Sequence, residues 1–413
     1  MVEKTKQVLY QKIAGDLKKR IISGEFDKDK KLSSIREIAS RYSTTPVTVT
    51  NALKLLENDG LIERKGGSGV FLKERSRDPF FPVDDLKKIF NSILENEGSD
   101  AFEYGESSGF HGLKDVLRPR LQGVLENMEK REILITSGSQ QALHLIFSSL
   151  LKVGDWVLVE EPTYLAALRI LREKGVRIET VSMKENGPDM KELKRIFESR
   201  PLKMAYLMPR YQSPTGLCYS NTVKSAVAGL ANKNGVYIVE DNSFGELDFG
   251  GNTEEPLKVS SSLHIYLSSF SKTFLSGARV GYCICGKDIY RNLTMAKEDS
   301  DLASPLFFQI VLSKYIKSGQ YDKRLKKINN ISRNIFKEIK EKVKETVQKY
   351  GGEMMNTKGG YSFWCRIKDS ESAKFITEMK KEGFKVENGK EFTIHEIPDC
   401  YCVKYVRGMK KTT

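Results

Sequence analysis

The sequence Leu-Ser-Ser-Phe-Ser-Lys-Thr-Phe-Leu-Ser-Gly-Ala-Arg-Val-Gly-Tyr, residues 267–282, decides the fold of most of this 413-residue chain. It follows a short apolar run and places Lys272 among hydroxyl side chains, with Arg279 seven residues later. An amine in this setting can form a Schiff base while its hydroxyl and guanidinium neighbours bind a phosphate. Because a lone lysine is usually a solvated surface residue, the meaning of the motif depends on its surroundings.

Short apolar runs rich in β-branched residues alternate with helical stretches around this motif. The runs are residues 133–135, 156–159, 204–207, 236–239 and 265–267. Continuous apolar strands that alternate with helices indicate an α/β fold with a mostly parallel, buried central sheet. Ligands of such sheets lie beyond the carboxyl ends of the strands, so the residues after each run are the candidates for function.

Polar residues follow two of these runs. Residues 136–141, Thr-Ser-Gly-Ser-Gln-Gln, come after the first run and open a helix, whose backbone N–H groups can hold a phosphate. Glu240 and Asp241 follow the fourth run, where a carboxylate can keep a pyridine nitrogen protonated. Taken singly, each feature has a plainer explanation, because a Gly-Ser turn is usually only a turn and a strand-end aspartate is usually a helix cap.

In this order and spacing, the features resemble the fold-type-I aminotransferase family over roughly residues 80–408. The matching stretches are Tyr104-Gly105, Gly109, Gly112-Leu113-Lys114, Ser137 to Gln141, Glu161 to Tyr164, Pro214-Thr215-Gly216, Glu240-Asp241-Asn242, Gly245-Glu246-Leu247, Ser269 to Thr273 and Gly277 to Tyr282. The resemblance implies pyridoxal 5'-phosphate (PLP) as cofactor, with Lys272 as the catalytic Schiff-base lysine, Asp241 on the pyridinium nitrogen and Tyr164 stacked on the ring. It also implies a set of phosphate-binding residues: Ser139, Gln140, Ser269, Ser271 and Arg279.

Three positions depart from the pattern of a working aminotransferase. Ser213 stands where an asparagine is usual before Pro-Thr-Gly, and Phe244 replaces a tyrosine; both usual groups hydrogen-bond the phenolic oxygen of the cofactor. Lys404 stands where an arginine usually grips the substrate carboxylate, and lysine supplies a point charge in place of a bidentate fork. Together the changes favour a binding site with residual or no transaminase activity, whose effector carboxylate Lys404 would contact.

The start of the chain predicts three short helices and a basic hairpin. Apolar residues recur at helical spacing over 8–22, and an S-x-x-E capping box at 34–37 starts a second helix. A third helix runs over 45–60, with proline in its first turn, and the basic stretch 64–69 lies between two apolar runs. These features indicate a mostly α winged helix-turn-helix, although a small helical dimerisation domain would show the same periodicity.

The residues within this segment resemble the GntR-family DNA-binding domain over 7–73. The matching positions are Leu32 to Ala39, Thr48-Val49, Ala52-Leu53, Leu56, Gly60-Leu61-Ile62 and Gly67-Ser68-Gly69. The resemblance implies binding to double-stranded operator DNA, with Arg36, Thr48, Arg64 and Lys65 as contact candidates.

Two positions of the segment differ from the family pattern. Ser33 replaces a proline, and Pro46 replaces an arginine that often precedes the recognition-helix threonine. Because a proline side chain cannot read a base edge, we expect an unusual operator.

Charge and composition agree with this division. Residues 1–77 contain 17 Lys and Arg against 10 Asp and Glu, an excess of +7, whereas the other residues share the remaining +7 of the net +14. A basic excess in the first fifth of the chain favours nucleic acid as the partner there. We find no run of about 20 apolar residues and no signal-peptide pattern, so we expect a cytoplasmic protein that contacts no membrane. Six cysteines and four histidines show no zinc-ligand spacing, and we expect buried thiols and no metal.

We therefore expect a winged-helix domain at 1–75, a short joint at 76–85 and an aminotransferase-like PLP- and effector-binding domain at 86–413. A GntR-type head on such a body resembles the MocR subfamily of regulators, and the family implies a homodimer. The favoured hypothesis is a regulator that senses PLP or an amino compound through aldimine chemistry. The alternatives are an active aminotransferase of the aminoadipate-transaminase-like branch with an appended head, and a regulator that has lost PLP.

Overall fold

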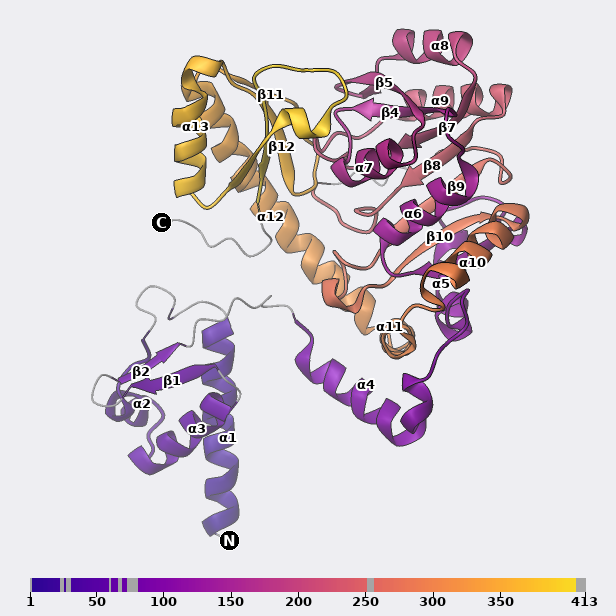
Figure 1. Ribbon diagram of the computed structural model, residues 1–413. Helices are drawn as coiled ribbons and strands as arrows, with labels where there is room; N and C mark the ends of the chain where they lie inside the picture. Colours follow the sequence, from indigo (N-terminus) through magenta and orange to yellow (C-terminus); the bar gives the residue numbers. More distant parts are fainter. Residues whose placement is uncertain are drawn as a thin grey trace. The chain divides into compact units, whose positions relative to one another are not determined.

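The chain divides into two compact units, which meet in the sequence between Phe81 and Pro82 (Figure 1). The computed structural model describes residues 2–22, 26, 31–58, 61–65, 69–72, 81–250 and 256–405, without the side chains of residues 2–8, 19, 22 and 65. Residues 76–80 of the predicted joint at 76–85 lie outside the described residues, and helix α4 already begins at Val83.

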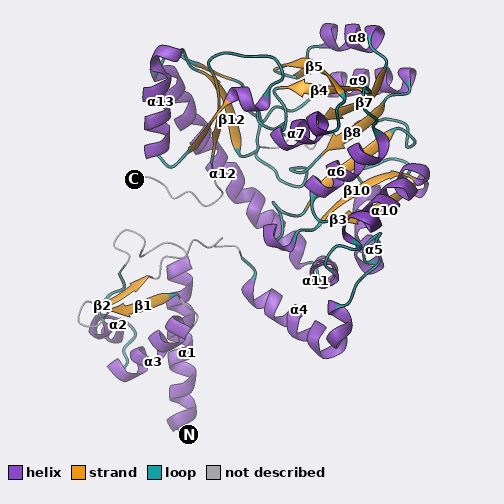
Figure 2. Ribbon diagram, viewed as in Figure 1, coloured by secondary structure: helices purple, strands orange, loops and turns teal. Residues whose placement is uncertain are grey.

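Three helices and a two-stranded antiparallel sheet form the smaller unit (Figure 2). They are α1 (Val2–Ile22), α2 (Ile35–Arg41), α3 (Pro46–Asn58), β1 (Ile62–Lys65) and β2 (Gly69–Leu72). The capping box expected from the sequence is present, because the Ser34 hydroxyl accepts the Glu37 N–H at 3.2 Å and the Glu37 carboxylate accepts the Ser34 N–H at 2.7 Å. The predicted winged helix is therefore confirmed.

One apolar core holds this unit together. Its buried members come from all three helices and from the hairpin, and include Ile13, Leu17, Leu32, Ile38, Val49, Leu53, Leu56, Ile62 and Val70. Helix α3 buries positions 48, 49, 52, 53 and 56, whose spacing of one to four residues defines a single helical face. The opposite face of α3, with Val47, Asn51 and Lys54, is exposed.

A large sheet forms the centre of the second unit, and within the described residues its strand order is β3-β10-β9-β8-β7-β4-β5-β6. The strands are β3 (Arg131–Thr136), β4 (Trp156–Glu161), β5 (Arg177–Lys184), β6 (Gly187–Pro188), β7 (Leu202–Leu207), β8 (Tyr237–Asp241), β9 (His264–Ser269) and β10 (Gly281–Gly286). Strands β9, β8, β7, β4 and β5 are parallel to one another, whereas β10 is antiparallel to both β3 and β9. The mostly parallel sheet is confirmed.

Helices cover both faces of this sheet (Figure 2). One face carries α6 (Ser139–Leu150), α7 (Leu165–Glu173) and α10 (Lys287–Asp301). The other face carries α5 (His111–Gln122), α8 (Met190–Ser199), α9 (Asn221–Asn234) and α11 (Leu306–Lys317), and α4 (Val83–Asn96) packs against α11. Because these helices cover the two faces of the large sheet, the carboxyl ends of its parallel strands stay open at one edge.

The last part of the unit is a long helix and a second, antiparallel sheet in the order β11-β12-β14-β13. Its elements are α12 (Gln320–Lys349), β11 (Glu353–Met354), β12 (Ser362–Arg366), α13 (Asp369–Lys381), β13 (Lys385–Asn388) and β14 (Cys400–Lys404). Short 3₁₀ segments lie at Gly98–Phe102, Met128–Lys130, Ser276–Ala278 and Gly389–Phe392. This smaller sheet positions Lys404, which pairs in register with Ser362 on one side and Lys385 on the other.

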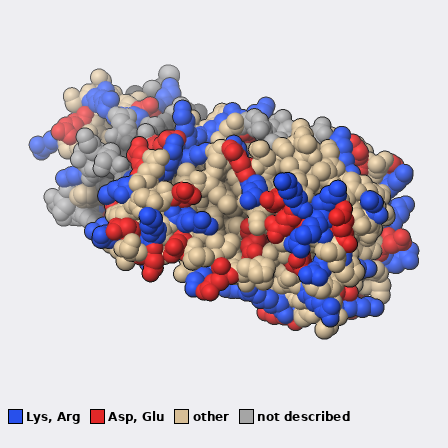
Figure 3. All heavy atoms as spheres, turned by 90° about the horizontal axis from the view of Figure 1, so that it is seen from above, with Lys and Arg blue, Asp and Glu red and all other residues tan. Residues whose placement is uncertain are grey.

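The described residues contain no helix that is both long and apolar enough to cross a bilayer. Within the same residues, no three His, Cys, Asp or Glu side chains are grouped so as to hold a metal ion. All six cysteines are described and none forms a disulfide; five of them are buried as expected, and Cys218 is partly buried. On the face drawn in Figure 3, basic and acidic side chains are interspersed.

Candidate functional site

The phosphate-binding turn and the lysine motif predicted from the sequence lie next to each other at the open edge of the large sheet. Strand β10 brings them together, because Gly281 at its start pairs with Thr136 of β3 on one side and with Ser269 of β9 on the other. Asp241 ends the neighbouring strand β8, where it pairs with Leu267. Residues more than 100 positions apart therefore form one site.

Arg279 and two glycines shape the turn after β3. The Arg279 side chain donates from Nη2 to the carbonyl oxygen of Ser137 at 2.8 Å. A Cβ atom on Gly138 would lie 2.6 Å from that same Nη2, and one on Gly281 would lie 2.7 Å from the Cα of Gly138. Gly138 also has a φ of +91°, which side chains other than that of glycine rarely tolerate. The turn is therefore packed against the guanidinium group with no space for a methyl.

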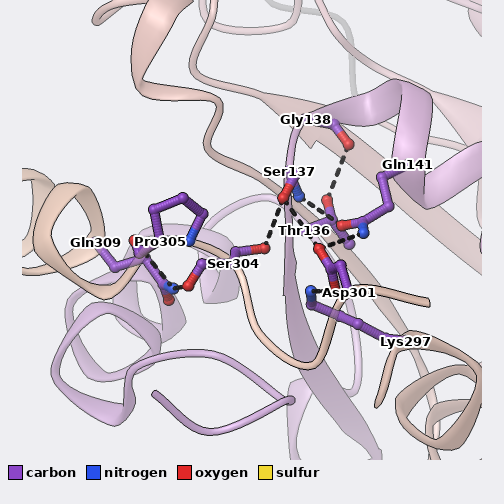
Figure 4. Close-up of polar contacts among 9 residues, drawn as sticks. All are labelled: Thr136, Ser137, Gly138, Gln141, Lys297, Asp301, Ser304, Pro305 and Gln309. Carbon is purple, nitrogen blue, oxygen red and sulfur yellow. Dashed lines mark hydrogen bonds and ion pairs between the residues drawn. The ribbon is translucent and has the colours of Figure 1, made fainter. Parts of the chain in front are cut away.

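A polar network fixes the turn from the side of α10 (Figure 4). The Gln141 side chain accepts the Ser137 N–H at 2.7 Å and donates to Asp301 at 2.6 Å. Asp301 forms an ion pair of 2.6 Å with Lys297, whose side chain is completely buried. The hydroxyls of Ser137 and Ser304 lie 3.0 Å apart, within hydrogen-bonding distance. Helix α10 and the loop after it thus set the shape of the turn.

The other predicted phosphate ligands surround this turn. Ser139 and Gln140 begin α6, and Gly138, at the cap position, offers no side chain to the first N–H groups of the helix. The hydroxyl of Ser269 donates to that of Ser271 at 3.0 Å and accepts the Ser271 N–H at 3.2 Å. A helix start, two hydroxyls and a guanidinium are donors that suit a phosphate.

Asp241 is buried and held by three donors. Its Oδ2 accepts the Tyr206 hydroxyl at 2.9 Å, and its Oδ1 accepts the backbone N–H and the hydroxyl of Ser243 at 3.0 and 2.5 Å. Burial raises the pKa of Asp241, and the hydrogen bonds from Ser243 and Tyr206 oppose that rise. Neither Tyr206 nor Ser243 was singled out from the sequence, although Ser243 follows Asp241 closely enough to suggest a local hydrogen bond.

Tyr164 precedes α7 and faces the same site. Its hydroxyl donates to the side-chain oxygen of Gln140 at 3.3 Å. Burial raises the pKa of Tyr164, and so does the nearby charge of Asp241, while Arg279 lowers it. The predicted ring-stacking, phosphate-binding and pyridine-binding residues therefore lie close enough together to influence one another electrostatically.

Lys272 lies in the loop after β9, beside two aromatic rings. Its Nζ is 5.8 Å from the ring centre of Phe244 and 5.7 Å from that of Tyr361. Although solvent reaches the side chain, partial burial of the ammonium group lowers the pKa of Lys272, and the positive charge of Lys404 lowers it further. A lowered pKa increases the fraction of neutral amine, which is the nucleophilic form.

The departures noted in the sequence lie around this lysine. Phe244 presents a hydrocarbon ring to Lys272 where a tyrosine would present a hydroxyl. Ser213 precedes Pro214 in the segment between β7 and α9 and is half-buried. Both substitutions exchange a larger hydrogen-bonding side chain for a smaller or apolar one.

The predicted carboxylate contact, Lys404, already has an acidic partner. It forms an ion pair with Glu387 on the neighbouring strand β13, and its Nζ lies 5.0 Å from the ring centre of Phe392. Burial acts to raise the pKa of Glu387, but hydrogen bonds from Lys385 and Lys404 hold it below the usual value. Glu387 therefore offsets the charge that would attract an effector carboxylate.

The predicted DNA-contact residues differ in their exposure and in the groups that they contact. Arg36 is exposed on α2, whereas Thr48 is 7% exposed and its hydroxyl lies 2.9 Å from that of Thr45. Arg64 donates to the carbonyl of Thr50 at 3.2 Å and forms an ion pair of 3.2 Å with Glu57. The side chain of Lys65 lies outside the described residues. Their roles in DNA contact stay predictions.

The residues at the sheet edge fit PLP. Asp241 supplies a buried carboxylate for the pyridine nitrogen, and Lys272 supplies an amine of lowered pKa. The turn after β3 offers the start of α6 together with the Arg279 guanidinium for the phosphate.

Two family models match this chain. One is described as aminotransferase class I and II and matches residues 68–405. The other is described as bacterial regulatory proteins, gntR family, and matches residues 9–72. Together they span nearly the whole chain and meet close to the boundary between the two compact units.

Similar proteins include both enzymes and regulators. An uncharacterized aminotransferase of Saccharolobus solfataricus is 32% identical over 73% of this chain and 75% of its own length. An uncharacterized HTH-type transcriptional regulator of Bacillus subtilis, YisV, is 25% identical over 92% of this chain and 89% of its own length. The crystal structure of kynurenine aminotransferase from Pyrococcus horikoshii, in complex with PMP, superposes with a TM-score of 0.72 and 28% identity, covering 86% of this chain and 88% of that one.

Proposed function

Since the chain belongs to the aminotransferase class I and II family and carries a GntR-family head, as MocR-type regulators do, we propose that it is a DNA-binding transcription regulator that senses PLP or an amino compound. The observation that carries this proposal is the union of a winged helix with an amine site that keeps Lys272 and Asp241 but has Phe244 beside the lysine. In this proposal the chain acts in the cytoplasm as a homodimer, with 1–75 as DNA-binding domain, 76–85 as joint and 86–413 as sensor.

PLP, the cofactor of this family, supplies an aldehyde that condenses reversibly with primary amines and releases water. In the proposal, Lys272 provides the resident amine, and its lowered pKa keeps more of that amine in the neutral, reactive form. Asp241 holds a proton on the pyridine nitrogen, and Tyr164 lies against the ring. The phosphate is bound by Ser139, Gln140, Ser269, Ser271 and Arg279.

An incoming amino compound would compete with Lys272 for the aldehyde. Because Glu387 offsets the charge of Lys404, a carboxylate on that compound is held weakly. For such a compound to switch transcription, it must bind two arrangements of the dimer with different affinity. Release of Lys272 from the cofactor supplies a physical difference between those arrangements. Turnover is not needed for this function, and we expect little or none.

The experiment begins with the absorbance spectrum of the purified full-length chain with PLP, before and after borohydride. We expect a visible absorption band and, after reduction, cofactor attached to Lys272 in a peptide mass map. The Lys272→Ala variant should show neither, and Lys287→Ala, which changes an exposed lysine at the start of α10, should behave as wild type. A wild-type chain with no band and no attached cofactor would favour the alternative of a regulator that has lost PLP.

A second measurement separates sensing from catalysis. We expect a reporter driven by the operator to respond to PLP or to an amino compound in the wild type and to lose that response in Lys272→Ala, with DNA binding retained. The competing function, an active aminotransferase, has support from the 32% identical relative named an aminotransferase and from the retained pair Lys272 and Asp241. Conversion of amino acids to keto acids at ordinary aminotransferase rates, with reporter output independent of Lys272, would establish that competing function.

A further inference from the structure

The exposed face of the recognition helix α3 has an unusual chemistry for a DNA-reading surface. Burial of positions 48, 49, 52, 53 and 56 turns the opposite face to solvent. On that face Val47 is 70% exposed, and Asn51 and Lys54 are exposed as well. The first turn, Pro46 to Val49, contains no charged side chain. The end of the helix that enters the major groove in a winged helix thus presents an apolar side chain and an amide.

The polar groups next to this face are already engaged. The Thr50 hydroxyl donates to the carbonyl of Pro46 at 2.9 Å, and the Thr48 hydroxyl lies 2.9 Å from that of Thr45. Arg64 contacts Glu57 and the Thr50 carbonyl from the side of β1. Asn51 is exposed, and among the described residues its side-chain amide has no hydrogen-bond partner. Its donor and acceptor are therefore available to a ligand.

Val47 and Asn51 are placed along α3 so that both can contact neighbouring base pairs. They are four residues apart, so their side chains lie on the same face, separated by about 6 Å along the helix axis. Successive base pairs are about 3.4 Å apart. One helix face can therefore contact two base pairs within about two steps of each other.

The chemistry of the base edges indicates which bases these two side chains can recognise. An apolar side chain contacts the C5-methyl of thymine, and an asparagine pairs in a bidentate manner with N6 and N7 of adenine. Guanine is read mainly by arginine or lysine, and the first turn of α3 has neither. Lys54 lies two turns into the helix, where a phosphate contact suits its flexible point charge.

We infer that the recognition helix reads A·T base pairs, with Val47 on a thymine methyl and Asn51 on an adenine. This inference rests on the proposed DNA-binding function and adds to it the class of sequence that is recognised. The occupant of the face is duplex DNA, because the match to the gntR model covers 9–72 and residues 1–77 have an excess of positive charge of +7.

The first step of the test is selection of binding sites from a pool of random-sequence duplexes by the full-length chain. We expect each half-site to contain two A·T pairs within about two base-pair steps of each other. Next, single thymines of the selected site are replaced by deoxyuridine, which removes only the methyl group. At one position per half-site we expect affinity to fall about fourfold, the effect of one buried methyl. The Val47→Ala variant should bind both duplexes equally.

Matched variants separate base reading from general affinity. Asn51→Ala should lose discrimination against a changed adenine by about tenfold, the range of a bidentate contact. Lys54→Ala should weaken binding to all sequences alike and leave the selected sequence unchanged. All three side chains are exposed, so none of these substitutions disturbs the core.

Two results would overturn the inference. If the base preferences lost in Val47→Ala and Asn51→Ala are for G·C pairs, or if no deoxyuridine replacement affects the wild type, then Val47 and Asn51 do not read A·T pairs, although DNA binding stands. If the full-length chain binds no duplex even at low salt, the proposed function fails and the inference fails with it.

Discussion

The hydroxyl of Tyr206 on β7 donates to the buried carboxylate of Asp241 on β8 at 2.9 Å. This hydrogen bond lowers the pKa of Asp241 against the effect of burial, which raises it. It therefore helps to keep a negative charge where the pyridine nitrogen of the cofactor would lie.

Substitution of Tyr206 by Phe should weaken PLP binding about tenfold at neutral pH, since hydrogen bonds to charged groups contribute about 1.5–3 kcal/mol. The pKa of Asp241 should rise, so loss of PLP on acidification should begin at a higher pH than in the wild type. Equilibrium dialysis against PLP between pH 5 and 8 measures both effects. Tyr219→Phe is the control, because Tyr219 donates to another buried carboxylate, Glu160. Equal losses in both variants would contradict a specific role for Tyr206.

Glu387 should control how strongly Lys404 acts on the site. In Glu387→Gln, the charge of Lys404 is no longer offset, so the pKa of Lys272 should fall further. Borohydride trapping of PLP on Lys272, followed across pH by mass spectrometry, should then shift to lower pH. Carboxylate-bearing amino compounds should also bind more tightly. Glu396→Gln breaks an exposed ion pair with Lys390 and should change neither property. An unshifted trapping profile in Glu387→Gln would contradict the ion pair's role.

The buried Lys297 should be needed for the turn after β3. Lys297→Met removes the cationic partner of Asp301, and we expect a loss of about 3 kcal/mol in the free energy of unfolding, the lower end of values for buried pairs because Asp301 is partly exposed. PLP affinity should fall with it, because Asp301 also holds Gln141. Chemical unfolding with and without PLP measures both. Lys287→Met changes an exposed residue of the same helix and should leave both unchanged. A similar loss in that variant would show that the effect does not arise from the contact between Lys297 and Asp301.

Stability should depend on the protonation of Glu160. Burial raises the pKa of Glu160 to about 7, although hydrogen bonds from Tyr219, Met208 and Gln212 oppose the rise. Because the folded pKa lies above the unfolded value, the contribution of this group is fully present below about pH 4 and is lost as pH rises to about 7. The loss is on the order of 3 kcal/mol. Unfolding free energies of the wild type and Glu160→Gln should be measured from pH 4.5 to 8. The two should be closest near pH 4.5, and the wild type should become less stable relative to the variant as pH rises. Parallel curves would contradict this.

Release of Arg64 should strengthen DNA binding. Glu57→Gln removes its ion-pair partner, so the guanidinium becomes available to a backbone phosphate. We expect higher affinity and a steeper dependence on salt, by about 0.9 in the slope of log K against log salt concentration. Titrations of a duplex at several salt concentrations measure both. The double variant Glu57→Gln/Arg64→Ala should lose the gain; if the gain persists, it arises from removal of an acidic charge alone.

The sequence predicted much of this architecture because the decisive signals are local. Buried strands appear as uninterrupted apolar runs, and Ser34 with Glu37 marks a helix start by spacing alone. The site residues of the larger unit follow strand ends, and parallel strands bring their carboxyl ends together. For these reasons Asp241 and the lysine motif could be placed at one edge without coordinates.

Other features depend on contacts between distant segments. The pairing of β10 with β3 joins segments more than 100 residues apart, which no local pattern encodes. The sequence alone does not link Glu387 to Lys404, because the two side chains come together only through the pairing of β13 with β14. Thr48, a predicted DNA contact, lies on the buried face of α3 with Val49 and Ala52, which helical spacing could have shown, and its role in DNA contact stays a prediction. The same periodicity places Val47 and Asn51 on the opposite, exposed face of α3.

Gly138 and Gly281 are 143 positions apart, and a Cβ atom on Gly281 would lie 2.7 Å from the Cα of Gly138. A mutation to alanine at position 281 therefore forces the backbone of Gly138 to move, and one at position 138 displaces the Arg279 guanidinium. A change at either position disturbs the same turn, so recombination that replaces either segment must supply a glycine there. The turn and the strand are therefore inherited as one unit, although the genetic distance between them is a third of the chain.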